Sequence, residues 1–470
     1  MSTSQILHPD RLFSPITSVR QVARELYQGV QHLPIISPHG HTDPAWFADN
    51  LPFSNPAELL IQPDHYVFRM LYSQGVSLES LGIGQSGSAL EADPRNVWRI
   101  FAHYYYLFQG TPSRLWMDFV LHDVFGITEV LNNDTADSIY DIINTKLALP
   151  EYRPRQLFER FNIEVIATTE QPLDNLAHHK KIQNSAWQGR VITAFRPDNV
   201  LDPEFIGFAN NIQQLGELTN CDTQDYTQYL EALKIRRQYF IAHGATSSDH
   251  GHVSACTADL SDLNARALFA KAMTGTITSD EAEIFRGHML TQMAQMSIED
   301  GLVMQLHAGC YRNHNPQVLT QFGRDKGADL PLPNEFVHNL KPLLDKFGNS
   351  TDLSLILFTL DETTYSRELA PLAGHYPALK LGPAWWFHDS PEGMKRFRQQ
   401  TMETAGFYNT VGFNDDTRAF LSIPARHDVA RRVDCNFLAE LICEHRITET
   451  QGHELAYDLS YRLAKEAYRL

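Results

Sequence analysis

The chain has 470 residues, of which 43% are hydrophobic, and its formal net charge is −17. That length allows a large core, and so acidic a surface disfavours nucleic acid and anionic membranes as partners. The five cysteines form no CxxC pair, which argues against a disulfide framework or a zinc ribbon. No signal peptide pattern opens the chain, and its apolar runs are too short to span a bilayer. We therefore expect a soluble, cytoplasmic protein.

The first elements are a helix and a short strand. Residues 16–31 have helical spacing, and the apolar run Leu33–Ile36 that follows ends in His39 and His41. On an extended chain these two imidazoles point to the same side, and Gly40 leaves the space between them clear. Such a pair suits a divalent metal, which needs further protein ligands and an open position for catalysis. Taken alone, the pair also fits a strand cap and a backbone hydrogen bond.

Residues 45–150 are rich in aromatic residues and helix formers, which predicts a large, mostly helical insertion after the first strand. Four aromatic residues at helical spacing are expected in its core: Trp98, Phe101, Tyr105 and Phe108. Asp64, directly before His65 and Tyr66, is expected to cap the start of a helix.

After residue 150, short apolar runs alternate with helical patterns. Near-continuous apolar strands between helices indicate a parallel sheet buried on both faces, and eight of them predict a (β/α)₈ TIM-type barrel. With the first strand, the runs are Leu33–Ile36, Ile163–Thr169, Val191–Phe195, Phe240–Ala245, Leu302–His307, Leu353–Thr359, Ala378–Gly382 and Thr410–Phe413. The predicted organisation is 1–44 (N-terminal helix and first strand), 45–150 (helical insertion) and 151–470 (the rest of the barrel).

Polar residues gather where these runs end, which is where a barrel of this kind places its chemistry. Besides His39 and His41, the exits carry Thr168-Thr169-Glu170, Arg196-Pro197-Asp198, Ser247-Ser248-Asp249-His250, His307 with Arg312, Asp361, Trp385-Trp386 and Asp415-Asp416-Thr417-Arg418. This concentration favours the metal interpretation of the two histidines. Arg196, Arg312 and Arg418 predict a strongly electropositive pocket that recognises a carboxylate ligand.

Longer motifs point to a family. They are PIISPHGHTDP at 34–44, DHYVFRMLYSQGV at 64–76, ATTEQPLDNLAHH at 167–179, TAFRPDNV at 193–200, SSDHG at 247–251, QLHAGCYRNHNP at 305–316, WWFHDSPEGM at 385–394 and DTRAFLSIPARHD at 416–428. They run in order across nearly the whole chain. With the histidine pair and the late Asp, the chain resembles the uronate (glucuronate) isomerases of the amidohydrolase superfamily.

This resemblance implies an aldose–ketose isomerase acting on hexuronates, a small sugar acid being its substrate, through a cis-enediol. It implies one divalent metal on His39, His41 and Asp416, with zinc the first choice and manganese, iron and cobalt compatible. Tyr66 and Arg418 would move the proton, and Asp416 would also serve catalysis in ring opening. As a base, the Tyr66 phenol would need acidification by Arg418 or the metal. The implied substrate contacts are His65, Tyr66, Arg196, His307, Arg312, Trp385 or Trp386, and Arg418. A homo-oligomer is expected.

Two predicted strands of this chain lack residues that are typical of the wider superfamily, and this reduces the number of alternative functions. The fourth run, FIAHGAT, has no Lys for a bridging carbamate, and the sixth, LSLILFTLDE, offers no His, so a binuclear hydrolase is disfavoured. His307 is expected to donate a hydrogen bond to substrate rather than to ligate the metal. Two alternatives remain: a mononuclear metal-dependent hydrolase or lactonase on the same scaffold, and a binding protein for sugar acids. The reaction product separates the first from an isomerase, and metal content separates the second.

Overall fold

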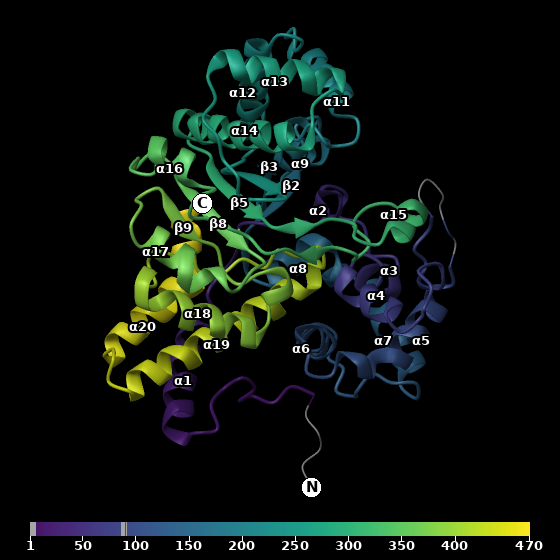
Figure 1. The fold of residues 1–470 in the computed structure, drawn as a ribbon. Helices are drawn as coiled ribbons and strands as arrows, with labels where there is room; N and C mark the ends of the chain where they lie inside the picture. The colour runs from purple at the N-terminus through teal and green to yellow at the C-terminus, as the bar shows by residue number, and fades with distance from the viewer. Residues whose placement is uncertain (1–5, 86–89, 91) are drawn as a thin grey trace.

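A parallel β-sheet forms the centre of the molecule, with helices around it (Figure 1). The computed structural model describes residues 6–85, 90 and 92–470. Seven strands lie in the order β1–β2–β3–β4–β5–β8–β9, and each neighbouring pair is parallel. Their bounds are β1 Ile35–Ser37, β2 Ile163–Glu170, β3 Arg190–Phe195, β4 Ser247–His252, β5 Val303–Ala308, β8 Leu355–Thr359 and β9 Leu379–Leu381. The predicted α/β class with a parallel sheet is confirmed.

The eighth barrel position is filled by an irregular segment, residues 410–417. Thr410 forms a single parallel bridge with Leu381 at the end of β9. The other end of the segment accepts a hydrogen bond at Thr417 O from the backbone N–H of His41, which follows β1. The segment thus joins the two edges of the sheet, which curls as a barrel does. The expected strand Thr410–Phe413 does not extend further, because Gly412 and Asp416 have φ of 75° and 36°, outside strand geometry.

The expected fourth strand, Phe240–Ala245, was wrong. Residues up to Ala242 complete α12 (Tyr226–Ala242), and Gly244 then turns the chain with φ of 94°. The apolar residues there belong to a helix face packed on the sheet; Phe240, for example, is completely buried. The true strand is β4, whose polar sequence SSDHGH hid it from a search for apolar runs. Asp249 and His250 therefore lie within the sheet rather than in a loop.

Helices follow the strands as the alternation predicted. The helix expected at 16–31 is α1 (Thr17–Val30), and the capping box of Thr278 and Glu281 opens α14 (Ser279–Asp300). Further helices after β2 are α9 Ala177–Gln183, α10 Asp198–Leu201, α11 Phe208–Thr219, α13 Asp262–Thr274, α16 Lys341–Phe347, α17 Ala370–Ala373, α18 Pro391–Ala405, α19 Ile423–Cys443, α20 Glu449–Tyr457 and α21 Leu463–Ala467. No helix of the described ranges is long and apolar enough to cross a membrane.

All the regular secondary structure that is described in the segment 45–150 is helical. Its helices are α2 Pro44–Asp49, α3 Pro56–Leu60, α4 His65–Tyr72, α5 Pro94–Tyr104, α6 Pro112–Phe119 and α7 Ala136–Leu147, and α8 Pro154–Arg160 leads into β2. Four of them begin with Pro after a residue whose side chain caps the helix: Asp43, Asn55, Asp93 and Thr111. The four aromatic residues expected in the core are all buried. Because this core also includes Ile35 and Ile163 of the sheet, the boundaries at 44/45 and 150/151 remain a proposal.

A further excursion leaves the sheet after β5. Residues 310–331, named here the 310–331 excursion, contain β6 (Cys310–Tyr311), α15 (Pro316–Phe322) and β7 (Leu330–Pro331), with β6 and β7 antiparallel. Val318 and Phe322 of α15 share a hydrophobic cluster with Phe68 of α4. The excursion therefore reaches from the barrel to the helical insertion, beside α3 and α4 in Figure 1.

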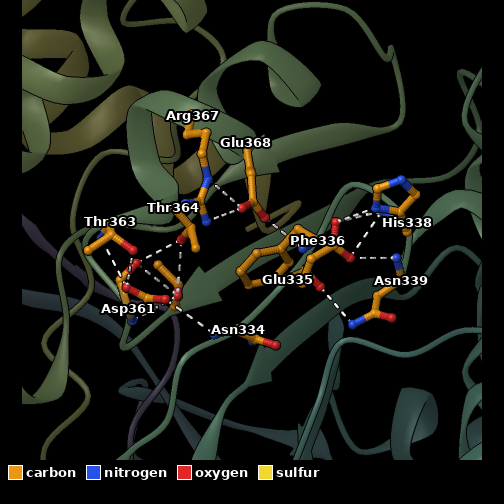
Figure 2. A network of polar contacts seen from close by, with 11 residues as sticks. Asn334, Glu335, Phe336, His338, Asn339, Asp361, Thr363, Thr364, Arg367 and Glu368 are labelled. Atoms are coloured by element: carbon orange, nitrogen blue, oxygen red, sulfur yellow. Dashed lines mark hydrogen bonds and ion pairs between the residues drawn. The ribbon is translucent and has the colours of Figure 1, made fainter.

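Residues 334–336, which follow the 310–331 excursion, are fixed to the residues after β8 (Figure 2). The backbone N–H of Asn334 donates to Asp361, and that of Phe336 donates to Glu368 at 2.7 Å. Asp361 also accepts hydrogen bonds from Thr363, which hold its own turn. Asp361, in the loop after β8, and Glu368, in the helical turn Tyr365–Leu369 that follows, thus set the path of residues 334–336. Asp361, which the sequence placed at a strand exit, has this structural role.

Candidate metal centre and active site

The histidine pair meets a carboxylate from the other edge of the sheet. His39 and His41 follow β1, and Asp416 ends the irregular eighth segment. The Nε2 atoms of His39 and His41 lie 3.5 and 3.3 Å from Asp416 Oδ1. Ligands placed tetrahedrally at 2.0–2.2 Å from one ion are about 3.3–3.6 Å apart. This set therefore has the donor types and the spacing of a divalent metal site.

The unusual backbone at Asp416 explains why it, and not Asp415, reaches the histidines. Asp416 has φ of 36°, so the two neighbouring carboxylates point in different directions. Asp415 accepts a hydrogen bond from His427 Nε2 at 3.0 Å. Burial alone would raise the pKa of Asp416, but His41 and His39 beside it hold that pKa below its ordinary value. The group is therefore a carboxylate, the form that binds a cation.

The predicted substrate residues surround the triad in one cavity. It has a volume of about 490 Å³, within the range of small-molecule sites. All eight line it: His65, Tyr66, Arg196, His307, Arg312, Trp385, Trp386 and Arg418. They come from four strand exits and from α4, which brings the helical insertion to the mouth of the barrel. Residues far apart in sequence thus meet at the carboxyl ends of the strands, where such barrels carry their chemistry.

Helix α4 presents His65 and Tyr66 to the cavity. Its N-cap is Asp64, whose carboxylate accepts the backbone N–H of Tyr66 at 2.8 Å, as predicted. The two rings stack with centroids 4.6 Å apart. Burial, helped by the positive charge of Arg418, lowers the pKa of His65 to about 3. His65 is therefore neutral near pH 7 and can both donate and accept a hydrogen bond.

Burial and a nearby arginine act in opposite directions on the pKa of Tyr66. Burial raises the pKa of its phenol, and the Arg426 guanidinium, whose carbon lies 5.4 Å from the ring centroid, acts in the opposite direction. Arg426 is itself buried and paired with Asp389 at 2.5 Å. The sequence named Arg418 or a metal as the acidifying group, and the structure adds Arg426 from α19.

The expectation of a strongly electropositive pocket was wrong. Arg196 pairs with Asp198 at 3.0 Å and with Asp249 at 3.4 Å, while Arg312 pairs with Asp329 at 2.9 Å. Arg418 lies 3.8 Å from Asp325. Five arginines and six aspartates line the cavity. The sequence missed this balance because most of these carboxylates lie in loops, beyond the strand exits.

Asp249 was named only as part of a strand exit, yet it lies beside the triad. It is completely buried in β4, and its Oδ1 is 2.9 Å from His307 Nε2. Although the two atoms are this close, neither has a hydrogen-bond partner of suitable geometry among the described residues. Burial would raise the pKa of Asp249, but His307, His39 and Arg196 hold it well below its ordinary value. The SSDHG motif was the available signal, and the wrong fourth strand concealed it.

Glu170, another predicted exit residue, lies outside the cavity lining. It ends β2, accepts a hydrogen bond from Thr193 of β3 and lies 3.7 Å from His179 Nε2. Its neighbour Thr169 lines the cavity instead. Strand alternation explains the difference, since consecutive side chains point to opposite faces.

Glu170→Gln is expected to stabilise the protein at pH 8 by up to about 3 kcal/mol and to change little at pH 5. Burial raises the pKa of Glu170 from 4.5 to about 7, so folding favours the protonated form. Its contribution to stability is complete below pH 4.5 and is lost as the pH rises through 7. Gln keeps the neutral form at every pH. Urea unfolding at both pH values measures the difference, and an equal effect at pH 5 and pH 8 would contradict this account.

The fold and the candidate metal triad are those of a barrel enzyme that has its chemistry at the strand ends. Comparison with known proteins is more specific: the family described as glucuronate isomerase matches residues 14–468. A uronate isomerase of Rhizorhabdus wittichii is 63% identical over 464 residues, covering 99% of this chain and 98% of the relative. The chain belongs to the glucuronate isomerase family and is thus an isomerase.

Solved structures agree. A glucuronate isomerase from Caulobacter crescentus superposes with a TM-score of 0.97 at 58% identity, covering 98% of this chain and 97% of the other. A uronate isomerase from Thermotoga maritima gives a TM-score of 0.91 at 28% identity, covering 98% and 99%. The resemblance inferred from the motifs is confirmed.

Proposed function

We propose that this chain interconverts aldose and ketose forms of hexuronates, D-glucuronate with D-fructuronate and D-galacturonate with D-tagaturonate. The observation that carries the proposal is one cavity that holds a metal-type triad beside Tyr66 and Arg418 in a chain of this family. His39, His41 and Asp416 would hold one divalent ion, zinc being our first choice. The cytoplasmic location and a homo-oligomeric state stay predictions.

The residues divide the reaction between them. A divalent cation bound at the triad would supply Lewis-acid stabilisation of charge on substrate oxygens. Tyr66 would take the C2 proton and return it to C1 on the same face of a cis-enediol. Arg418, at the cavity wall, would stabilise the developing negative charge. Asp416 would accept the hydroxyl proton whose removal opens the pyranose ring.

His65 and Trp386 would fix the sugar. The neutral His65 can hydrogen-bond a hydroxyl without adding charge, and its ring lies 6.2 Å from the indole of Trp386. Trp385 lies deeper, with its indole N–H donated to Thr359 O at 3.2 Å. Of the two tryptophans, Trp386 is the less buried and is the one proposed to contact substrate. His307, held beside Asp249, would donate to a substrate oxygen.

The reaction can be followed by proton NMR of D-glucuronate in D₂O. New ketose signals with deuterium incorporated at C1 are expected, because the proton passes through a group that exchanges with solvent. Dialysis against a chelator should abolish the change, and a divalent metal should restore it. An unchanged substrate in the presence of metal-loaded protein would refute the proposal and direct assays to lactones and amides of sugar acids.

A further inference from the structure

The segment 410–417, which carries Asp416, is fixed to the sheet by little strand pairing. Its start forms a single bridge, from Thr410 to the end of β9. A regular strand such as β5 is instead held along its length by backbone hydrogen bonds to both neighbours. The far end of the segment is held by hydrogen bonds at Asp415 and Thr417. Between these two ends the segment needs support from another part of the chain.

The residues around α21 lie against this middle part. An added Cβ on Gly412 would come within 2.8 Å of Leu459 O, so the two backbones pack directly on each other. Tyr468, which follows α21, shares a hydrophobic cluster with Val303 of β5 and with Trp385. Trp385 lines the active-site cavity. Tyr468 therefore lies on the inner side of the curled sheet, together with the site.

The hydroxyl of Tyr468 is the centre of a buried chain of hydrogen bonds. It donates to Gln305 Oε1 at 3.0 Å and accepts a hydrogen bond from Asn414 Nδ2 at 3.4 Å. The amide of Gln305 donates in turn to Ser247 Oγ at 3.3 Å. All four side chains are buried, so water does not replace a bond that is lost. The chain connects the segment 410–417 to β5 and β4.

This chain of hydrogen bonds lies next to the residues of the site. Its three other members each lie two residues before a site residue: Ser247 before Asp249, Gln305 before His307 and Asn414 before Asp416. On β4 and β5, side chains two residues apart point to the same face. Burial raises the pKa of Tyr468, and the carboxylates of Asp249 and Asp416 raise it further. The phenol is therefore neutral and keeps the proton that it donates.

We propose that Tyr468 is a positioning residue for the metal centre, which it serves by holding Asn414 and thereby the backbone that carries Asp416. This inference rests on the metal site of the proposed function. The hydroxyl supplies hydrogen bonds at a place where the segment has no strand pairing. The distances of 3.5 and 3.3 Å from Asp416 to His39 and His41 suit one ion only while the segment stays in place.

Tyr468→Phe tests this role, because it removes the hydroxyl and keeps the ring. The dissociation constant for zinc, measured by competition with a chromophoric chelator, should rise about tenfold. Urea unfolding of the metal-free protein measures stability separately. A residue that only stabilises the fold would change the unfolding and leave the zinc affinity of the folded protein as it was. A dissociation constant within about twofold of wild type would therefore overturn the inference.

Tyr461→Phe is the matched control. Tyr461 precedes α21, and its hydroxyl donates to Glu164 of β2 at 2.7 Å, away from the cavity lining. This variant also loses a tyrosine hydrogen bond, yet its zinc affinity should stay within about twofold of wild type. An equal loss of affinity in both variants would indicate a general effect of destabilisation and would overturn the inference.

Asn414→Leu removes the same hydrogen bond from its other side and serves if Tyr468→Phe folds poorly. It should also raise the dissociation constant for zinc about tenfold. In the Asn414→Leu background, adding Tyr468→Phe should change the affinity less than about threefold, because the bond that links the two residues is already lost. An unchanged affinity in Asn414→Leu, or a full tenfold further loss in the double variant, would overturn the inference.

Zinc binding by the wild-type protein separates this inference from the proposed function. If the wild type binds zinc but isomerises no hexuronate, the proposed reaction fails, and the comparison of zinc affinities still decides the role of Tyr468. If the wild type isomerises and Tyr468→Phe binds zinc equally well, the inference alone fails. A wild-type protein that binds no divalent metal would overturn both.

Discussion

Asp416→Ala is expected to remove both bound metal and activity. Metal content should fall from about one ion per chain to a small fraction of that value, and kcat/KM should fall at least about a thousandfold. The reason is geometric: Asp416 Oδ1 lies within 3.5 Å of the Nε2 atoms of both His39 and His41, so its loss leaves two neutral ligands. Metal analysis of dialysed protein, with circular dichroism to verify folding, measures the effect.

Asp329→Asn is the matched control for this experiment. Asp329 lines the same cavity and is paired with Arg312, but it supplies no atom to the triad. Its metal content should equal that of the wild type even if substrate binding weakens. Full metal occupancy in Asp416→Ala would show that the ion is bound elsewhere and would remove the basis of the proposed triad.

Apolar patterning predicted most of the sheet, and its error at the fourth strand has a physical cause. Strands buried among helices, such as β5 and β8, consist of side chains that avoid water, and both were found at their expected places. β4 is equally buried, but Ser247, Ser248 and Asp249 replace the apolar residues because this strand borders the site. Where function needs polar groups inside the sheet, hydrophobic periodicity loses its signal.

The sequence could predict which residues form the site but not which of their charges form ion pairs. Side chains at strand ends converge whatever the details of the loops, so His39, His307 and Arg418 could be placed together from the sequence. The ion pairs within the site depend on backbone turns, such as the one at Asp416, which has a positive φ. Arg69, which also lines the cavity, was missed although it lies four residues after His65, a spacing that puts both on one helix face.

Tyr66→Phe is expected to reduce kcat about a thousandfold or more with metal content and KM nearly unchanged, because the phenol would carry the proton between C2 and C1. Burial raises the pKa of Tyr66, so its reactive, ionised form is a minor species at neutral pH. Wild-type kcat should accordingly rise with pH, since each step upward increases the ionised fraction, and Tyr66→Phe should lose this rise. Initial rates from pH 6 to pH 10 measure both effects.

Tyr365→Phe provides the matched control, because its hydroxyl is also buried, has no hydrogen-bond partner in the described part of the chain and lies outside the cavity lining. This variant should keep wild-type activity. Exchange of the C2 proton in D₂O then decides the role of Tyr66 itself. If Tyr66 is the base, Tyr66→Phe must lose exchange and isomerisation together, because both begin with the same proton abstraction. A variant that still exchanges the C2 proton but forms no ketose would show that another group removes the proton, and it would restrict Tyr66 to a later step.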